Sequence, residues 1–380
     1  MVEWKKLGEI ANLVRGKVIS KEYIRDNEGE YPVYSSQTAN DGVFGCINSY
    51  MFDGDFLTWT TDGAYAGTVF RRKGKFNITN VCGLIDIKEK INQGFLYYWL
   101  SITAKNYVLE GMGNPKLMSN VAATIPIPIP SLQEQERIVE TLDTFTASID
   151  NLKEQIAQRL KQYEHYRDQL LDLEGKEIKG ILSFGNDFLL KARIGWQGLT
   201  KKEYKMSGEY KLVTGTDFTK NQRIDFNSCV YVDKERYEQD EYIKLKVGDV
   251  LLTKDGTLGK VAYIDALELP ATLNGGVFVV RDLKNRVLPK FIMFYLTSNH
   301  FKKWMQQNHT SGSIQHLTQK LLSSFTIPVF SLSEQERIVS ILDTFEASIQ
   351  NLEAQLAERQ KQYEYYRNEL LSFEESEGAE

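Results

Sequence analysis

Two stretches of the chain place an apolar residue at alternating steps of four and three positions. The first runs from Ile138 to Leu170 and the second from Ile338 to Leu370, so each pattern lasts more than four heptads. Such spacing puts the apolar side chains on one face of a helix and is typical of a coiled coil. The predicted seam comprises Ile138, Leu142, Phe145, Ile149, Leu152 and Ile156 in the first helix, and Ile338, Leu342, Phe345, Ile349, Leu352 and Leu356 in the second.

The two helices are near-copies of one segment. The residues from Ser131 onwards recur from Ser331 onwards at a constant offset of 200 positions, and about two thirds of them are identical. Each copy opens with Ser-x-x-Glu, a capping box that marks a helix start, and no Gly or Pro follows until Gly175 and Gly378. We therefore expect two helices of about 40 residues, or roughly 60 Å. Because they share one chain and nearly one sequence, we expect them to pair antiparallel about a pseudo-two-fold axis, with a globular domain at each end.

Arg159 and Arg359 interrupt the seam at equivalent positions. A guanidinium that is buried between helices destabilises the fold unless it is paired. Two interpretations stay open: the arginines set the register of the helix pair by bonding to seam Glu or Gln side chains, or they contact a partner protein.

The sequence outside the helices shows a fainter repeat. Its markers are Gly54-Asp55, Asp62-Gly63 and Gly67, which correspond to Gly248-Asp249, Asp255-Gly256 and Gly259. The drifting offsets indicate small insertions and deletions between two copies of one scaffold, with surfaces that differ.

Local patterns in these regions predict both strands and helices. Short apolar runs such as Val250–Thr253, set among Gly and Asp turns, predict strands, and the aromatic runs Phe95–Leu100 and Phe291–Leu296 predict helices. The Ile-Pro steps at Ile125–Pro130 and Ile327–Pro328 predict extended connectors, since proline disfavours helix in the preceding residue.

These patterns predict an α/β protein in which two α/β domains are joined by two long helices, which form an antiparallel coiled coil with pseudo-two-fold symmetry. The predicted boundaries are residues 1–130 for the first globular domain, 131–174 for the first helix, 175–330 for the second globular domain, 331–373 for the second helix and 374–380 for an acidic tail.

The composition excludes a disordered chain and gives no sign of a membrane role. The 380 residues are 42% hydrophobic and 12% aromatic, which suffices for packed cores. The cysteines, Cys46, Cys82 and Cys229, are odd in number and lack CxxC spacing, which argues against a disulfide framework or a zinc knuckle. No apolar run of 18 residues and no signal-peptide core occurs. We therefore expect a soluble, cytoplasmic protein.

Charge is divided unevenly along the chain, although the net charge is only −5. The two helical segments carry −5 and −8, whereas residues 175–330 carry +7, from 23 basic and 16 acidic residues. This asymmetry is expected if only the globular domains face phosphate, and it is equally expected if the helices simply carry solvated Glu.

Searches for catalytic and metal-binding motifs give only fragments. Gly111–Pro115 lacks the second proline and the aromatic residue of an amino-methyltransferase motif, and Gly256–Lys260 is followed by Val261 where a phosphate-binding loop needs Ser or Thr. His309 and His316 have no carboxylate or thiol at ligand spacing. We therefore expect a non-catalytic chain that binds no metal.

Each globular domain is closed by an Ile-Pro connector, the motif Leu-x-Glu-Gln-Glu-Arg-Ile-Val (Leu132–Val139 and Leu332–Val339) and a long helix. With this arrangement the whole chain resembles the specificity subunit of type I restriction-modification enzymes, and Trp4–Ile10 resembles the usual opening of a domain in that family. The second domain departs from the pattern, because the residues around Phe188–Gly198 match Trp4–Ile10 poorly.

The resemblance implies two target-recognition domains, each of which reads one half of a split, asymmetric site in double-stranded DNA. It also implies that the helices set the gap between the half-sites and that two methyltransferase subunits dock on them. Those subunits would bind S-adenosylmethionine and methylate adenine, and restriction subunits that use ATP and Mg²⁺ would cleave DNA. The chain itself would bind none of these cofactors.

Candidate DNA contacts are polar and basic side chains on predicted loops. Lys and Arg suit phosphates, whereas amides, hydroxyls and carboxylates suit base edges; turn-forming or solvated roles are the alternative for each. The candidates are Ser35, Ser36, Gln37, Thr38, Thr60, Thr61, Asp62, Arg71, Arg72, Lys73, Lys75 and Lys116 in the first domain, and Thr216, Lys254, Asp255, Thr257, Lys260, Ser313, Gln315 and His316 in the second.

A second function stays open from the sequence alone. The chain could be a coiled-coil scaffold whose globular ends bind proteins and not DNA. The basic second domain favours DNA binding.

Overall fold

The structure, a computed structural model, describes residues 2–111, 113–194, 198–308 and 316–373. Its contacts divide the chain into two compact units. Unit 1 comprises Met1–Asn151 and Leu356–Glu380, and unit 2 comprises Leu152–Gln355. Unit 1 therefore contains the first globular domain, the first half of the helix that follows it and the second half of the other long helix. Unit 2 contains the second globular domain and the two remaining helix halves.

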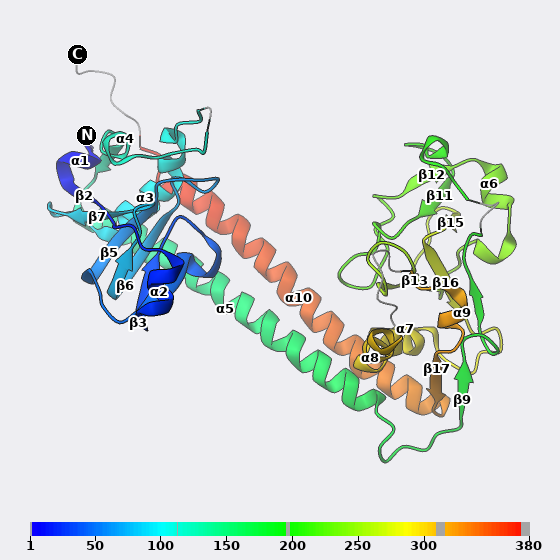
Figure 1. The fold of residues 1–380 in the computed structure, drawn as a ribbon. Coiled ribbons are helices and arrows are strands. Elements are labelled where there is room, and N and C mark those ends of the chain that lie inside the picture. Colours follow the sequence, from blue (N-terminus) through cyan, green and yellow to red (C-terminus); the bar gives the residue numbers. More distant parts are fainter. Residues whose placement is uncertain (1, 112, 195–197, 309–315, 374–380) are drawn as a thin grey trace. The chain divides into compact units, whose positions relative to one another are not determined.

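The two long helices are α5 (Leu132–Leu171) and α10 (Leu332–Leu370), of 40 and 39 residues. Both begin one residue after the predicted serine. In unit 1 the start of α5 lies with the end of α10, and in unit 2 the end of α5 lies with the start of α10, so the helices pair antiparallel as predicted (Figure 1).

At the start of both long helices, the structure shows the serine bond of the predicted capping box but not the glutamate bond. The Ser131 hydroxyl accepts a hydrogen bond from the amide of Glu134 at 3.2 Å, and Ser331 repeats this at 3.2 Å. The Glu134 carboxylate accepts from both Nε and Nη2 of Arg137, at 2.9 and 2.6 Å, which holds its pKa below the usual range. The Glu134 carboxylate, which a capping box would place on the backbone at the helix start, thus binds the guanidinium of Arg137 through two hydrogen bonds.

Unit 1 contains a six-stranded sheet with the strand order β2-β7-β5-β6-β3-β4 and a two-stranded sheet, β1-β8. All neighbours are antiparallel except β3 and β6. Its elements, with η for 3-10 helices, are β1 (Glu3–Lys6), α1 (Leu7–Ile10), β2 (Ala11–Arg15), α2 (Lys21–Asp26), β3 (Glu28–Tyr34), η1 (Ala39–Gly42), β4 (Val43–Ile47), β5 (Phe52–Thr60), β6 (Val69–Ile78), β7 (Cys82–Ile87), α3 (Gln93–Thr103), η2 (Ala104–Tyr107), α4 (Ser119–Ala122) and β8 (Pro126–Ile129).

Unit 2 contains sheets with the strand orders β10-β16-β13-β14, β12-β11-β15 and β17-β9. Its elements are β9 (Gly180–Ser183), β10 (Leu189–Lys191), η4 (Lys201–Glu203), β11 (Tyr210–Val213), β12 (Val230–Val232), α6 (Lys234–Glu238), η5 (Glu241–Ile243), β13 (Val250–Thr253), β14 (Val261–Tyr263), β15 (Ala271–Leu273), β16 (Val277–Arg281), α7 (Pro289–Thr297), α8 (Asn299–Gln307), α9 (Gln319–Leu322) and β17 (Thr326–Val329).

The two globular domains are copies of one scaffold. The order β10-β16-β13-β14 repeats β2-β7-β5-β6, and β9 pairs with β17 as β1 pairs with β8. The predicted strand at Val250–Thr253, the helices at both aromatic runs and the extended Ile-Pro connectors are confirmed. The second domain opens at Gly180–Ser183, several residues before Phe188–Gly198, so the predicted place of this opening is wrong. Ile181, which is 66% exposed, lies at the position of Trp4 in the first domain. Because isoleucine does not resemble tryptophan, the similarity of the two openings is not evident in the sequence.

The first two seam positions of each helix are buried in a globular domain. Ile138 and Leu142 belong to the core of unit 1, and Ile338 and Leu342 to that of unit 2; all four are 0% exposed. The other predicted seam residues are buried or half-buried. One apolar face therefore serves both as domain core and as helix seam.

Aromatic stacking is repeated where the helices meet. In unit 1 Phe145 stacks on Tyr366 with ring centroids 5.2 Å apart, and in unit 2 Phe345 stacks on Tyr166 at 5.5 Å. Arg359 lies over the Phe145 ring at 5.6 Å, and Arg159 over Phe345 at 5.9 Å. These cation–π contacts give each arginine a structural role in its own unit.

A buried glutamine ties each helix to its globular domain. Gln135 is 0% exposed; its Oε1 accepts from the amide of Asn92 at 2.8 Å, and its Nε2 donates to the Pro130 carbonyl at 2.9 Å. Gln335 accepts from the amide of Leu288 at 2.8 Å and donates to the Phe330 and Arg286 carbonyls at 3.0 Å. The motif glutamine thus joins helix, connector and the start of α3 or α7.

Candidate nucleic-acid interface

The loop between β5 and β6 in unit 1 is held by the hydroxyl of Thr60. This buried side chain donates to the carbonyl of Tyr65 and accepts from the amide of Thr68 at 3.0 Å. The Gly67 amide donates to the Thr60 carbonyl at 2.8 Å. Gly63 and Gly67 have φ of +95° and +80°, which glycine adopts without strain. The base of the loop is fixed while Tyr65 at its tip is exposed.

The loop between β13 and β14 in unit 2 has the same frame. The buried Thr253 hydroxyl donates to the Thr257 carbonyl at 2.6 Å and accepts from the Lys260 amide at 2.9 Å. The Gly259 amide donates to the Thr253 carbonyl at 3.1 Å, and Gly256 and Gly259 have φ of +70° and +75°. The repeated Asp-Gly and Gly residues of the sequence therefore form loops of the same backbone arrangement in both units.

A charged cluster stands beside the loop of unit 1. The Asp62 carboxylate accepts from the Thr61 hydroxyl at 2.6 Å and lies 3.5 Å from Nη2 of Arg15 and 3.6 Å from Nζ of Lys116. Arg15 also donates to the carbonyl of Asn80. Asp62 is largely enclosed, whereas the Lys116 side chain is 53% exposed. The fold thus presents Lys116 to solvent beside the loop, and it adds Arg15, which sequence reasoning missed.

Packing beneath this cluster fixes the segment that carries Lys116. The Leu117 amide donates to the Thr61 carbonyl at 2.9 Å, and the buried Trp59 indole donates to the Leu117 carbonyl at 3.0 Å. A Cβ on Gly83 would lie 2.2 Å from the Trp59 ring, so only glycine leaves room for it. Lys116 is therefore held by the core and not by a loop of its own.

The same place in unit 2 holds Asp255 and His316. Asp255 Oδ1 and His316 Nδ1 are 2.6 Å apart, and the Leu317 amide donates to the Lys254 carbonyl at 3.0 Å, as Leu117 does to Thr61. The His316 side chain is 55% exposed. The strand registers place Ala192 where the first domain has Arg15. The next residue, Arg193, is buried: burial lowers its pKa to about 10, and its Nε donates to the Leu273 carbonyl at 2.8 Å. The exposed basic side chain of the cluster is thus Lys116 in one unit and His316 in the other.

The predicted basic cluster of β6 is divided between two faces of the strand. Arg71, Lys73 and Lys75 are exposed, whereas Arg72 is 4% exposed, with its guanidinium between the rings of Tyr34 and Phe70. Residues in a strand alternate between faces, so four neighbouring cations cannot form one patch. The prediction that Arg72 contacts DNA is wrong in this arrangement.

Arg71 is exposed but engaged with the helix. Its guanidinium lies 2.8 Å from the Asp143 carboxylate on α5 and over the rings of Tyr97 and Tyr98. In unit 2, Lys290 of α7 forms the equivalent 2.7 Å pair with Asp343. Arg71 therefore anchors the domain to the helix, and of the four cations of β6, Lys73 and Lys75 remain as candidate phosphate contacts.

The other predicted contacts fall into four groups. Thr60 and Thr61 are 0% exposed and hydrogen-bonded inside the domain, so they are structural and offer nothing to DNA. Ser313 and Gln315 lie outside the described residues. Half-buried positions are Ser35, Ser36, Gln37, Thr38 and Lys254, and exposed positions are Thr216, Thr257 and Lys260.

Comparison with known protein families identifies the scaffold. The model of the type I restriction modification DNA specificity domain matches residues 1–162 and 197–359. These two matches take in the first globular domain, most of the second and most of both helices. The chain belongs to the type I restriction-modification DNA specificity family.

Two relatives align with this specificity chain from end to end, and a third aligns with about half of it. A Mycoplasma pneumoniae protein that is named as a type I specificity subunit is 32% identical over 379 residues, which are 98% of each chain. A Haemophilus influenzae protein named in the same way is 30% identical over 391 aligned residues, covering 98% of this chain and 96% of that protein. The specificity subunit of the M. pneumoniae type I restriction enzyme MpnII is 41% identical over 180 residues, 46% of this chain and 54% of that subunit.

Solved structures share the fold. The S subunit of a type I restriction-modification system from M. genitalium matches with a TM-score of 0.64 at 16% identity, covering 98% of this chain and 97% of that one. A chain from a structure that describes complex assembly and conformational transition of the type I system matches with a TM-score of 0.61 at 15% identity, over 97% and 96%. The fold of two globular domains with two long helices is thus shared with these S subunit structures.

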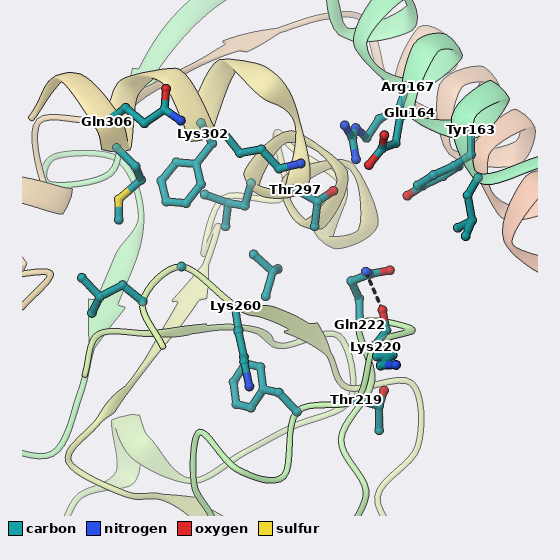
Figure 2. A pocket seen from close by; sticks show the side chains of 18 residues that line it. Tyr163, Glu164, Arg167, Thr219, Lys220, Gln222, Lys260, Thr297, Lys302 and Gln306 are labelled. Atoms are coloured by element: carbon teal, nitrogen blue, oxygen red, sulfur yellow. Dashed lines mark hydrogen bonds between the residues drawn. The ribbon is translucent and has the colours of Figure 1, made fainter. Parts of the chain in front are cut away.

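A cleft of about 560 Å³ lies inside unit 2 of the specificity chain. Figure 2 shows Lys302 and Gln306 on its α8 wall, Lys260, Lys220 and Gln222 on the opposite loops, and Tyr163, Glu164 and Arg167 on α5. The loop residue Lys260 links this cleft to the frame around Thr253. Three lysines and Arg167 line the cleft together with the single carboxylate of Glu164, and this positive lining suits an anionic ligand such as a phosphate backbone.

The part of the chain that the structure describes contains no group of three or more His, Cys, Asp or Glu side chains placed to hold a metal ion. No described helix combines the length and the apolar character that crossing a membrane requires.

Proposed function

We propose that this chain gives a type I restriction-modification complex its DNA sequence specificity. Each unit binds one half of a split, asymmetric site in double-stranded DNA, and partner subunits carry out the chemistry. The observation that carries the proposal is the loop that recurs in both units: its buried frame is the same, but its exposed side chains differ. Two DNA-binding domains that share one loop backbone but expose different side chains suit a DNA site whose two halves differ in sequence.

Charge supports DNA as the ligand. Residues 175–330 carry a net +7, and the cleft of unit 2 is lined by Lys220, Lys260 and Lys302. Lysine side chains that replace the counterions of DNA provide much of the affinity without reading sequence. Exposed polar groups on the loops, such as Thr257 and His316, are then free to contact base edges.

The helices offer two equivalent docking places for a partner. On the face opposite the seam, both helices expose the same residues, Glu136, Thr144 and Ala147 on α5 and Glu336, Thr344 and Ala347 on α10. We call these residues the outer strip. Two methyltransferase subunits that bind S-adenosylmethionine and methylate adenine would each occupy one copy, and restriction subunits that use ATP and Mg²⁺ would join them. The chain itself binds none of these cofactors, and the complex acts in the cytoplasm.

The test uses the chain produced together with the methyltransferase subunit of its own type I system. Native mass spectrometry is expected to give two methyltransferase subunits per chain and methyl transfer to adenine in duplex DNA. Ala147→Arg or Ala347→Arg, each at an exposed helix position where Arg is a good helix former, should leave one subunit bound. The control pair Ala157→Arg and Ala357→Arg, also exposed, should keep two. A wild-type chain that neither binds the methyltransferase nor supports methylation contradicts the proposal, and a double outer-strip variant that keeps both subunits refutes the docking places.

A further inference from the structure

The β5–β6 loop of unit 1 and the β13–β14 loop of unit 2 form matching hydrogen bonds. Residues that form the same bond in both loops can therefore be paired, which shows which positions keep their residue and which change it. The frame positions keep their residue type: Thr60 matches Thr253 and Gly67 matches Gly259. The carboxylate beside each loop, on Asp62 or Asp255, is also kept. Other positions on this frame change: the exposed Tyr65 becomes Thr257, the half-buried Thr68 becomes the exposed Lys260, and the exposed Lys116 becomes His316.

Tyr65 is the largest of these differences. Its carbonyl accepts from the hydroxyls of both Thr60 and Thr68, so its backbone is held at two points. Its side chain is 58% exposed, and among the described residues no aromatic ring or cation packs on it. Thr257 occupies the same place in unit 2, because its carbonyl accepts from Thr253. A fixed backbone with an open side chain is the arrangement that positions a group for a ligand.

A tyrosine and a threonine read DNA differently. The Tyr65 ring offers a flat apolar face for base stacking and a hydroxyl at its far end. Thr257 offers a short hydroxyl and a methyl group, which suit a base edge or a thymine methyl. The exposed cation next to each loop changes in parallel, because Lys116 is a permanent charge and His316 is charged only when protonated.

We infer that Tyr65 in unit 1 and Thr257 in unit 2 are equivalent base-contacting positions, and that they set which bases each half-site requires. The inference rests on the proposed function, because it assumes that each unit reads one half of a DNA site. It adds that specificity is carried by side chains on a shared loop frame, so a change at one tip alters one half-site only.

The test is a set of three exchanges in the complex with methyltransferase. Tyr65→Thr gives the first loop the tip of the second, and Thr257→Tyr does the reverse. Tyr23→Thr in unit 1 is the matched control, since Tyr23 is 47% exposed on α2, away from the loop. Methylation rates are measured on duplexes that carry each single-base change in either half of the site. Exposed substitutions are expected to leave the melting temperature nearly unchanged.

Tyr65→Thr is expected to change the rate ratio between the correct and an altered base by about ten-fold at one or more positions of one half-site, which is the usual effect of losing one base contact. Thr257→Tyr should do the same in the other half only, and Tyr23→Thr should change neither. Unchanged base preference in both loop variants, or an equal change in Tyr23→Thr, overturns the inference while methylation by the wild type upholds the proposed function. Absence of methylation by the wild-type complex contradicts the proposed function and this inference with it.

Discussion

The buried glutamines of the helix motif give the sharpest prediction about how the chain holds together. Gln335→Leu replaces the amide side chain with a slightly shorter apolar one and removes its hydrogen bonds to the Leu288 amide and to the Phe330 and Arg286 carbonyls. Gln135→Leu removes two such bonds in unit 1. In both cases backbone groups that were paired become unpaired in a buried place.

The magnitude follows from the number of groups left without a partner. A buried unpaired polar group destabilises the folded state by about 1–3 kcal/mol, and leucine restores part of this through its apolar burial. We expect a loss of about 3 kcal/mol for Gln135→Leu, with two unpaired groups, and about 4 kcal/mol for Gln335→Leu, with three. For units of this size each kcal/mol lowers the melting temperature by about 2–4 °C.

Scanning calorimetry of the whole chain measures both effects. Gln135→Leu should lower the melting temperature of the unit 1 transition, and Gln335→Leu should lower that of the unit 2 transition, so the two variants also assign the transitions. Gln133→Leu is the control, since Gln133 is exposed on the same turn of α5. The reasoning is refuted if Gln135→Leu shifts its transition no more than Gln133→Leu does.

Three further predictions concern single side chains. Arg72→Ala should destabilise unit 1 by about 3 kcal/mol in urea unfolding, whereas Lys73→Ala should leave stability unchanged and reduce the salt slope of DNA binding by about 1; equal destabilisation by both would contradict the assignment. Burial raises the pKa of Glu346, so the folded state binds that proton more tightly and loses stability as the pH rises through the folded pKa. Glu346→Gln should therefore stabilise unit 2 at about pH 7.5 and give no gain below about pH 4, and the same gain at both pH values would be the contrary result. Ile349→Asp, at a seam position that is 7% exposed, should abolish cooperative unfolding of unit 2, while the exposed neighbour Gln350→Asp should not.

The large elements could be predicted from the sequence because their signals are long and periodic. The heptads and the capping serines placed both helices within a few residues, since a stripe of 3.6-residue period over 40 residues has few alternatives. The repeat also predicted antiparallel pairing. The opening of the second domain was misplaced because its pairing with β17 depends on backbone hydrogen bonds, and Ile181 does not resemble Trp4.

The candidate site could be predicted only at the level of loops. Asp62, Lys116 and His316 do lie beside the loop tips, but Thr60 and Thr61 support the loop from beneath. Polar residue type alone does not separate these cases, because a threonine suits a base edge and a buried turn equally well. Strand alternation along β6 was the available signal that would have assigned Arg72 to the interior.

The central claim is that the two units read two different, separated parts of one DNA site. Sequencing of methylated adenines in DNA from cells that make this chain with its methyltransferase tests it most directly. The account predicts one motif with two defined parts of different sequence, separated by a fixed number of unspecified bases. A continuous motif, two identical inverted halves, or methylation without sequence preference would contradict it.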